Sequence, residues 1–248
     1  MSDTLIIFIT LMLMFAGGVL KGIVGIALPA FLIGTMSIFL PPREVVLIIL
    51  LPIMFSNFRQ AFQGEPVLSV VWRYRILAVC SCITIAIVAS FASTVRTDIL
   101  LLLAGCAVIL FGFVGLSGAI PHLPSRFDGW GQGVTGVLSG VLGGLTAMWG
   151  PPIAMYLMAR DVPKAQFVQA TGLLFSVSSV FMMAGIFVGD ELTWGVIAYS
   201  AAMVPAVFAG IKFGEWIRGY LDHGMFYRAV LVVFILIGLN LIRKAVFG

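Results

Sequence analysis

The chain has 248 residues, of which 61% are hydrophobic and only 10% are charged. At a mean hydropathy of +1.16, a soluble globule would expose large apolar patches, so this composition excludes a soluble protein. The net charge of +4 is modest and gives no reason to expect nucleic-acid binding. Continuous apolar runs, several near the roughly 20 residues that cross a bilayer as a helix, exclude a β-barrel and predict an α-helical membrane protein.

Glycine, proline and charged clusters divide the chain into apolar segments joined by short connections. The first segment follows Asp3, the only charge before it, so we do not expect a cleaved signal peptide. The connections leave no room for an extramembrane domain. The expected segments are residues 4–20, 22–40, 44–63, 72–94, 98–119, 129–148, 151–160, 165–188, 193–213 and 226–246.

A glycine-rich sequence occurs twice. Residues 18–25 (GVLKGIVG) reappear as residues 136–143 (GVLSGVLG), with the glycines in register. Each copy is followed by proline, at Pro29 or Pro151, and then by a turn of proline and a basic residue that leads into a long helix. This matched order predicts an internal duplication of about 120 residues. The two expected repeats are residues 1–120 and 121–248.

The basic residues predict the orientation of the two repeats. If each repeat opens with a hairpin that returns to its own side and continues through three spans, the second repeat is inverted. With both termini outside, eight basic residues are cytoplasmic and four are outside, whereas a parallel arrangement gives seven against five. The cytoplasmic group is Arg73, Arg75, Arg126, Arg160, Lys164, Lys212, Arg218 and Arg228, and the outer group is Arg43, Arg96, Arg243 and Lys244.

The expected fold is therefore all-α: a polytopic transmembrane bundle of two inverted repeats, each opening with a re-entrant or broken helical hairpin. Residues 151–160 are too short to cross the bilayer alone at 1.5 Å per residue. Pro151 should begin a half-helix deep in the membrane, where its positive end would stabilise an anion. The break near residues 21–25 and the helix carrying Pro29 predict a related site. Alternatively, these glycines only permit close helix packing.

Lys21 lies between apolar runs, where an unpaired charge costs several kcal/mol. A substrate anion or a distant carboxylate would neutralise it, unless the hairpin crosses fully and Lys21 reaches the cytoplasmic surface. Polar residues also share one face of the helix that follows, including Asn57, Arg59 and Gln60, although Arg59 could instead snorkel to the surface. Gln169 belongs to a similar face in the second repeat.

The acidic residues all lie at predicted helix ends or in loops, so the interior leans positive or neutral and favours anionic cargo over a cation. We expect no metal in the site. The candidate substrate-binding residues are Lys21, Gly22, Gly25, Asn57, Arg59, Gln60, Ser139, Gly143, Trp149, Gly150, Pro151, Gln169 and Ser176.

Several of these motifs resemble a known family. The duplicated glycine-rich openings, the Gly150-Pro151-Pro152 segment with the Pro163-Lys164 turn after it, and the length are similar to the TauE/SafE family of sulfite and sulfonate exporters. The resemblance implies a secondary transporter in the bacterial inner membrane that exports sulfite, sulfoacetate or a related organosulfonate without a cofactor. Transport would be driven by the proton gradient, with protons as the coupling ion, or by the cargo's own gradient, and a homodimer is left open. The first copy lacks the glycine cluster of many members, so the substrate stays undetermined.

Two other classes of function compete with a transporter. An intramembrane enzyme would use Ser139 as a nucleophile, but His122 and His223 lie in predicted loops, away from it. A non-transporting assembly partner would leave the two helix breaks unexplained. No P-loop is present, so ATP hydrolysis by this chain is not expected.

Overall fold

The computed structural model describes residues 3–36, 38–40, 42–91, 97–118, 122–146, 149–188 and 193–247, and the regular structure in these ranges is helical. The helices are α1 (Asp3–Val24), α2 (Leu28–Met36), α3 (Pro42–Ala61), α4 (Val67–Arg73), α5 (Arg75–Phe91), α6 (Thr97–Leu116), η2 (Ser125–Phe127), α7 (Asp128–Thr146), α8 (Gly150–Ala159), α9 (Lys164–Val188), α10 (Trp194–Gly219) and α11 (His223–Phe247). The expected ends at residues 94, 119 and 148 and the expected repeat boundary at 120–121 lie outside the described residues.

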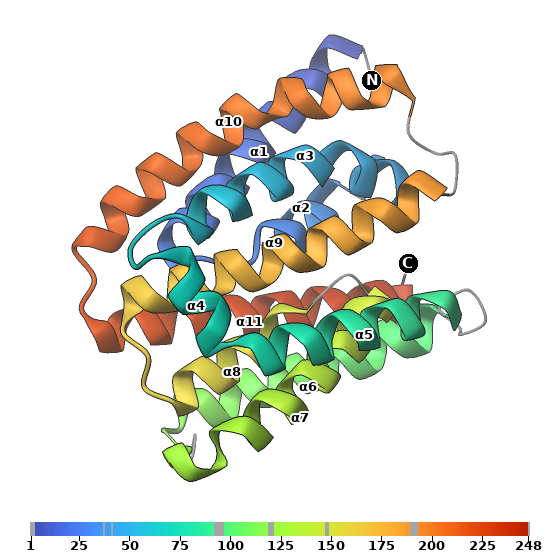
Figure 1. Cartoon of the computed structure of the whole chain (residues 1–248). Helices are drawn as coiled ribbons and strands as arrows, with labels where there is room; N and C mark the ends of the chain where they lie inside the picture. The colour runs from blue at the N-terminus through green and yellow to red at the C-terminus, as the bar shows by residue number, and fades with distance from the viewer. Residues whose placement is uncertain are drawn as a thin grey trace.

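The first opening hairpin breaks later than the sequence predicts. Lys21 is in the last turn of α1 rather than in the break, because its ammonium group finds partners on α3 and the helix can continue around it. The chain reverses between Gly25 and Ala27, whose φ angles of 80° and 83° lie in the left-handed region. The short helix α2 then returns toward the end of the bundle where α1 began (Figure 1).

Three other boundaries correct the prediction. The expected span that begins at residue 72 is two helices, α4 and α5, bent by 73° on either side of Tyr74. Helix α10 continues six residues past the expected end at 213, so Glu215 and Arg218 are helical rather than in a loop. Likewise, His223 is the first residue of α11. In each case tertiary partners extend or bend a helix whose ends the apolar pattern leaves undefined.

Several helices are long and apolar enough to cross a membrane. In the described ranges they are Leu5–Val24, Trp194–Gly219 and His223–Val246, with a fourth if the bent pair α4 and α5 forms one span. Helix α8, at 10 residues, is about 15 Å long and does not cross alone.

Close helix pairs build the bundle: α1 packs along α10, α5 along α7, and α6 along α11. Glycines make all three of these contacts possible, and those of α1 and α7 belong to the glycine repeat. A Cβ on Gly18 would stand 2.3 Å from the carbonyl oxygen of Val207, and one on Gly136 would stand 2.7 Å from that of Leu77. Such distances exclude any side chain, so at these positions the repeated glycines serve helix packing.

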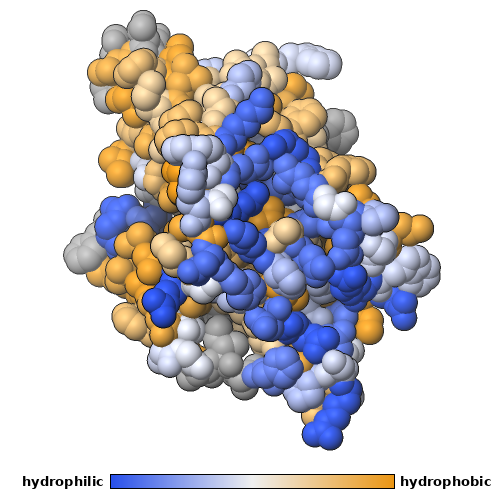
Figure 2. All heavy atoms as spheres, turned by 90° about the vertical axis from the view of Figure 1, so that its left-hand side faces the viewer, coloured by the Kyte–Doolittle hydropathy of each residue, from blue (hydrophilic) through white to orange (hydrophobic). Residues whose placement is uncertain are grey.

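The two ends of the bundle differ in polarity. Helix α1 begins and α11 ends at the right-hand end of Figure 1. The left-hand end carries the α3–α4, α8–α9 and α10–α11 connections, and Figure 2 shows hydrophilic side chains gathered over it between apolar flanks. We call this left-hand end the basic end, because the eight residues of the expected cytoplasmic group lie on the helices and turns that meet there. Of the expected outer group, Arg96 lies outside the described residues.

Candidate functional site

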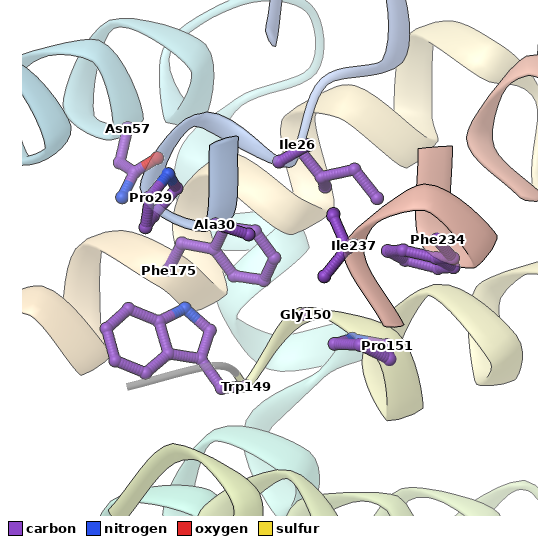
Figure 3. Close-up of a pocket in the computed structure, with 11 residues that line it drawn as sticks. Ile26, Pro29, Ala30, Asn57, Trp149, Gly150, Pro151, Phe175, Phe234 and Ile237 are labelled. Carbon is purple, nitrogen blue, oxygen red and sulfur yellow. The ribbon is translucent and has the colours of Figure 1, made fainter. Parts of the chain in front are cut away.

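The two opening hairpins meet at one cavity (Figure 3). The turn before α2 and the turn before α8 contribute its walls, and α3, α9 and α11 close it. Each helix start carries proline, Pro29 in α2 and Pro151 in α8. The lining residues are Ile26, Ala27, Pro29, Ala30, Asn57, Trp149, Gly150, Pro151, Phe175, Phe234 and Ile237.

The helix starts present backbone N–H groups to this cavity. The first residues of a helix have no carbonyl one turn earlier to bond, so the N–H groups of Ala30 and Gly150, which line the cavity, lack an intrahelical partner. Pro151 and Pro152 have no N–H to offer, so α8 supplies fewer donors than a proline-free helix start would. Both positive helix ends still point to the same space, which favours a negative charge there.

A buried lysine stands behind the cavity. Lys21 is only 1% exposed, and its Nζ donates hydrogen bonds to Ser56 Oγ at 2.8 Å and to Asn57 Oδ1. Both acceptors are neutral, and no carboxylate of the described residues forms an ion pair with Lys21. The Lys21 amino group is thus held by two neutral acceptors and has no counter-charge among the described residues.

Asn57 joins this lysine to the cavity. Its Oδ1 accepts from Lys21, and its Nδ2 donates to Ser179 Oγ at 3.2 Å. These two bonds fix which way the amide points and leave one N–H of Nδ2 without an acceptor among the described residues. Figure 3 shows the side chain beside Pro29, on the same side of the cavity as the Trp149 indole. Asn57 therefore carries the positive potential of Lys21 to the cavity wall.

The cavity is small. It leaves about 40 Å³ for the centres of water molecules, and one water needs about 10–15 Å³ on this measure. A few heavy atoms fill it. Its walls are apolar except for the Asn57 amide, the Trp149 indole N–H and the backbone of the helix starts. A ligand here would give up its hydrogen bonds to bulk water and form a few hydrogen bonds to these donors instead.

Residues 10–241 match the family model described as sulfite exporter TauE/SafE. The chain belongs to the TauE/SafE family. This match confirms the resemblance seen in the sequence and makes the chain a membrane transporter of the sulfite-exporter type. No curated protein and no solved structure shows a significant match.

Other predicted site residues shape the TauE/SafE hairpins rather than line the cavity. Gln60 Nε2 donates to the carbonyl oxygen of Gly25 at 3.2 Å and so holds the first turn against α3. Gln60 Oε1 is buried and has no hydrogen-bond partner among the described residues. Gly22 instead faces α10, where a Cβ would stand 2.4 Å from the carbonyl oxygen of Ile211.

The second hairpin is closed within itself. Ser139 Oγ donates to the carbonyl oxygen of Trp149 at 2.8 Å, and Gly143 lies against the Trp149 side chain. Ser139 occupies the position of Lys21 in the aligned glycine repeats. Equivalent positions in the two hairpins therefore carry different interactions: a neutral link to the backbone in one and a charge bonded to α3 in the other.

Three predicted residues lie away from the cavity. Arg59 forms a bidentate ion pair with Glu215 of α10, with both N···O distances at 2.8 Å. Gln169 bonds the backbone of residues 61 and 65 and so fastens the end of α3 to α9. Ser176 Oγ donates to the carbonyl oxygen of Gly172 in its own helix. In this conformation none of the three contributes to the cavity wall.

Sequence reasoning missed several lining residues. Phe175, Phe234 and Ile237 close the cavity from α9 and α11, but in the sequence they are ordinary apolar residues of long helices. Pro29 and Ala30 were signalled by the proline after the glycine repeat. The described part of the chain contains no cluster of side chains that could hold a metal ion.

Proposed function

We propose that this TauE/SafE transporter carries a small sulfur oxyanion, with sulfite the best fit, across the bacterial inner membrane. The observation that carries the proposal is the unpaired buried charge of Lys21, directed through Asn57 at a cavity between two helix N-termini. An anion there would complete the charge balance that the protein leaves open.

The size of the cavity favours sulfite within this chemical class. Sulfite has four heavy atoms, whereas sulfoacetate and taurine are larger and would need the cavity to open further than about 40 Å³. The polar groups near the cavity are fixed N–H donors. A compact, weakly basic oxyanion can accept hydrogen bonds from them. No acidic side chain of the described residues lines the cavity.

An inverted-repeat transport mechanism is supported by how the helices pair. In the expected duplication α1 corresponds to α7, and α5 corresponds to α10. Helix α1 of the first repeat packs along α10 of the second, and α7 of the second packs along α5 of the first. This reciprocal exchange is what a pseudo-two-fold relation between the repeats requires.

The same pairing refines which parts move. Rocking of one whole repeat against the other would break the glycine contacts of α1 with α10 and of α5 with α7. We infer instead that the unit of α1, α2 and α10 moves against the unit of α5, α7 and α8, around the cavity. The proton gradient or the cargo's own gradient would drive it, with the basic end facing the cytoplasm and both termini outside.

The alternatives receive less support. Ser139, the candidate nucleophile of an intramembrane enzyme, uses its hydroxyl proton to hold Trp149. His223 begins α11 and is bonded to Asp161 at the basic end, far along the chain from Ser139 of α7. A non-transporting assembly partner gives no reason for a buried unpaired lysine. One chain contains the whole cavity, so the proposed function does not require a homodimer.

Purified protein reconstituted in liposomes tests the proposal. We expect uptake of radiolabelled sulfite that unlabelled sulfite inhibits strongly, sulfoacetate weakly and acetate least. Intrinsic fluorescence should report binding directly, because Trp149 lines the cavity. A folded preparation that neither binds nor moves any of these anions would overturn the proposal, and equal preference for acetate would overturn the sulfur-oxyanion assignment.

A further inference from the structure

The geometry points to a lipid site on the flank of the bundle: a groove between α5 and α7 holds an acyl chain of an anionic phospholipid, whose phosphate lies between Arg75 and Arg126. This inference concerns a surface separate from the transport cavity and does not depend on the proposed substrate. Helices α5 and α7 lie side by side, with α4 at one end of the pair (Figure 1).

The groove is open and apolar. It encloses about 600 Å³, and seven residues line it: Cys80, Gly129, Trp130, Gly133, Val134, Val137 and Leu138. A Cβ on Gly133 would meet nothing within 4 Å, so the space beside this glycine is empty rather than filled by α5. The rim is prominent, because Trp130 is 79% exposed. A groove of this kind on a lipid-facing flank suits a flexible hydrocarbon chain.

Two arginines stand where the groove reaches the basic end. Arg126 is in the 3-10 helix η2, which runs directly into α7, and it precedes Gly129 by three residues. Arg75 begins α5 next to Ile76, and the Ile76 side chain lies 3.7 Å from the Cβ position of Gly129. Arg75 and Arg126 therefore lie at the starts of the two helices that form the groove, at the end where Gly129 and Trp130 line it.

Neither arginine has an acidic partner in the described part of the chain. Arg75 lies 5.1 Å from the centre of the Trp72 ring, and Arg126 lies 4.7 Å from that of Phe127. The neighbouring carboxylates are already engaged: Glu65 pairs with Arg73, and Asp128 pairs with Arg160. Unpaired arginines on exposed aromatic rings are typical of the headgroup layer, where they bind lipid phosphate.

This combination favours a phospholipid over other occupants. A free anion would satisfy the arginines but leave the apolar groove exposed. A second copy of the chain would cover the groove but would have to bring a carboxylate to two arginines at the headgroup level. One anionic phospholipid satisfies both parts at once, because its phosphate and its acyl chain are joined at the right depth.

Native mass spectrometry of the detergent-solubilised transporter tests the site. After incubation with a mixture of phosphatidylglycerol and phosphatidylcholine, we expect the wild type to retain phosphatidylglycerol preferentially. The double variant Arg75→Gln/Arg126→Gln should lose at least about tenfold in that preference, which corresponds to about 1.4 kcal/mol. Gly133→Leu, which fills the empty space in the groove, should reduce retention of both lipids. Arg243→Gln, at the opposite end, is the matched control and should behave as the wild type.

Each other outcome contradicts the site. Unchanged retention in both the double variant and Gly133→Leu would overturn it. Displacement of the lipid signal by millimolar inorganic phosphate alone would indicate a free-anion site instead. A dimer that Gly133→Leu converts to monomer, with lipid retention unchanged, would assign the groove to a second copy. Sulfite flux is not part of this readout, so failure of the lipid site and failure of the transport proposal are distinguishable.

Discussion

Lys21→Met separates a transport role for the buried lysine from a structural one. Methionine has a similar length and shape but no charge and no donor. The substitution therefore removes the ammonium group from a site that is 1% exposed and leaves the packing of α1 against α10 in place. Lys212→Met makes the same change at an exposed position of α10 and is the matched control.

The expected magnitudes come from the contacts of Lys21. Lys21 lies in the last turn of α1, so removing its charge recovers at most the about 2.5–3.5 kcal/mol that a lysine costs at the centre of a membrane helix. Ser56 keeps its bond to the carbonyl oxygen of Ile53, but Asn57 Oδ1 loses its donor, which costs about 1–3 kcal/mol. The balance is near zero or stabilising by up to about 2 kcal/mol. Anion binding should behave differently, because the substitution removes the positive charge behind Asn57 that would attract the anion. A loss of about 1.4 kcal/mol of binding free energy weakens affinity about tenfold.

Thermal unfolding and sulfite titration on the same preparation measure both quantities. We expect the Tm of Lys21→Met to equal or exceed that of the wild type, while the sulfite Kd rises at least about tenfold and flux falls. Lys212→Met should match the wild type in both. A large fall in Tm with an unchanged Kd would show that Lys21 serves only the fold, and would refute the argument that its charge is held for the substrate.

Three further substitutions test other parts of the structure. Asn57→Asp places a carboxylate beside Lys21, so the protein should fold but bind sulfite more weakly than Lys21→Met does, as measured by Trp fluorescence; undiminished binding would exclude Asn57 from the site. Ala27→Gly relieves the φ of 83° and should raise the free energy of unfolding by up to about 1 kcal/mol, whereas Ala30→Gly, in the first turn of α2, should not. Arg59→Ala breaks the ion pair with Glu215 and should lower the free energy of unfolding by about 1 kcal/mol or less. The sulfite Kd should stay unchanged, and a large rise in Kd would show that Arg59 contributes to the anion site.

The sequence predicts the helical class, most helices and the family because these depend on signals that repeat along the chain. Apolar length predicts the spans, and glycine followed by proline predicts both hairpin turns. Contacts between distant segments are less predictable. The sequence does not show that Arg59 meets Glu215, because the two residues are 156 positions apart and the apolar pattern ends α10 before Glu215.

Lys21 likewise has one feature that the sequence predicts and one that depends on distant contacts. Its charge and its place after the first apolar run are visible in the sequence, and they point to an anion site. Its helical conformation depends on Ser56 and Asn57, which lie 35 and 36 residues away. A charge without partners would favour a break at that point. With two acceptors supplied by α3, the helix continues for another turn and the break moves to Gly25.

The difference between Lys21 and Ser139 also bears on how the two hairpins respond to substrate. In the second hairpin, Ser139 bonds the carbonyl oxygen of Trp149, so that turn is held by a neutral contact that an anion would leave unchanged. In the first, the charge is bonded to α3, the turn contains a non-glycine residue at positive φ, and Gln60 holds it through a single bond to Gly25. An anion in the cavity would act most strongly on the Lys21 side, because only there does it meet an unpaired charge. The first hairpin is therefore the one whose geometry the substrate can bias, and the second provides the fixed wall against which it moves.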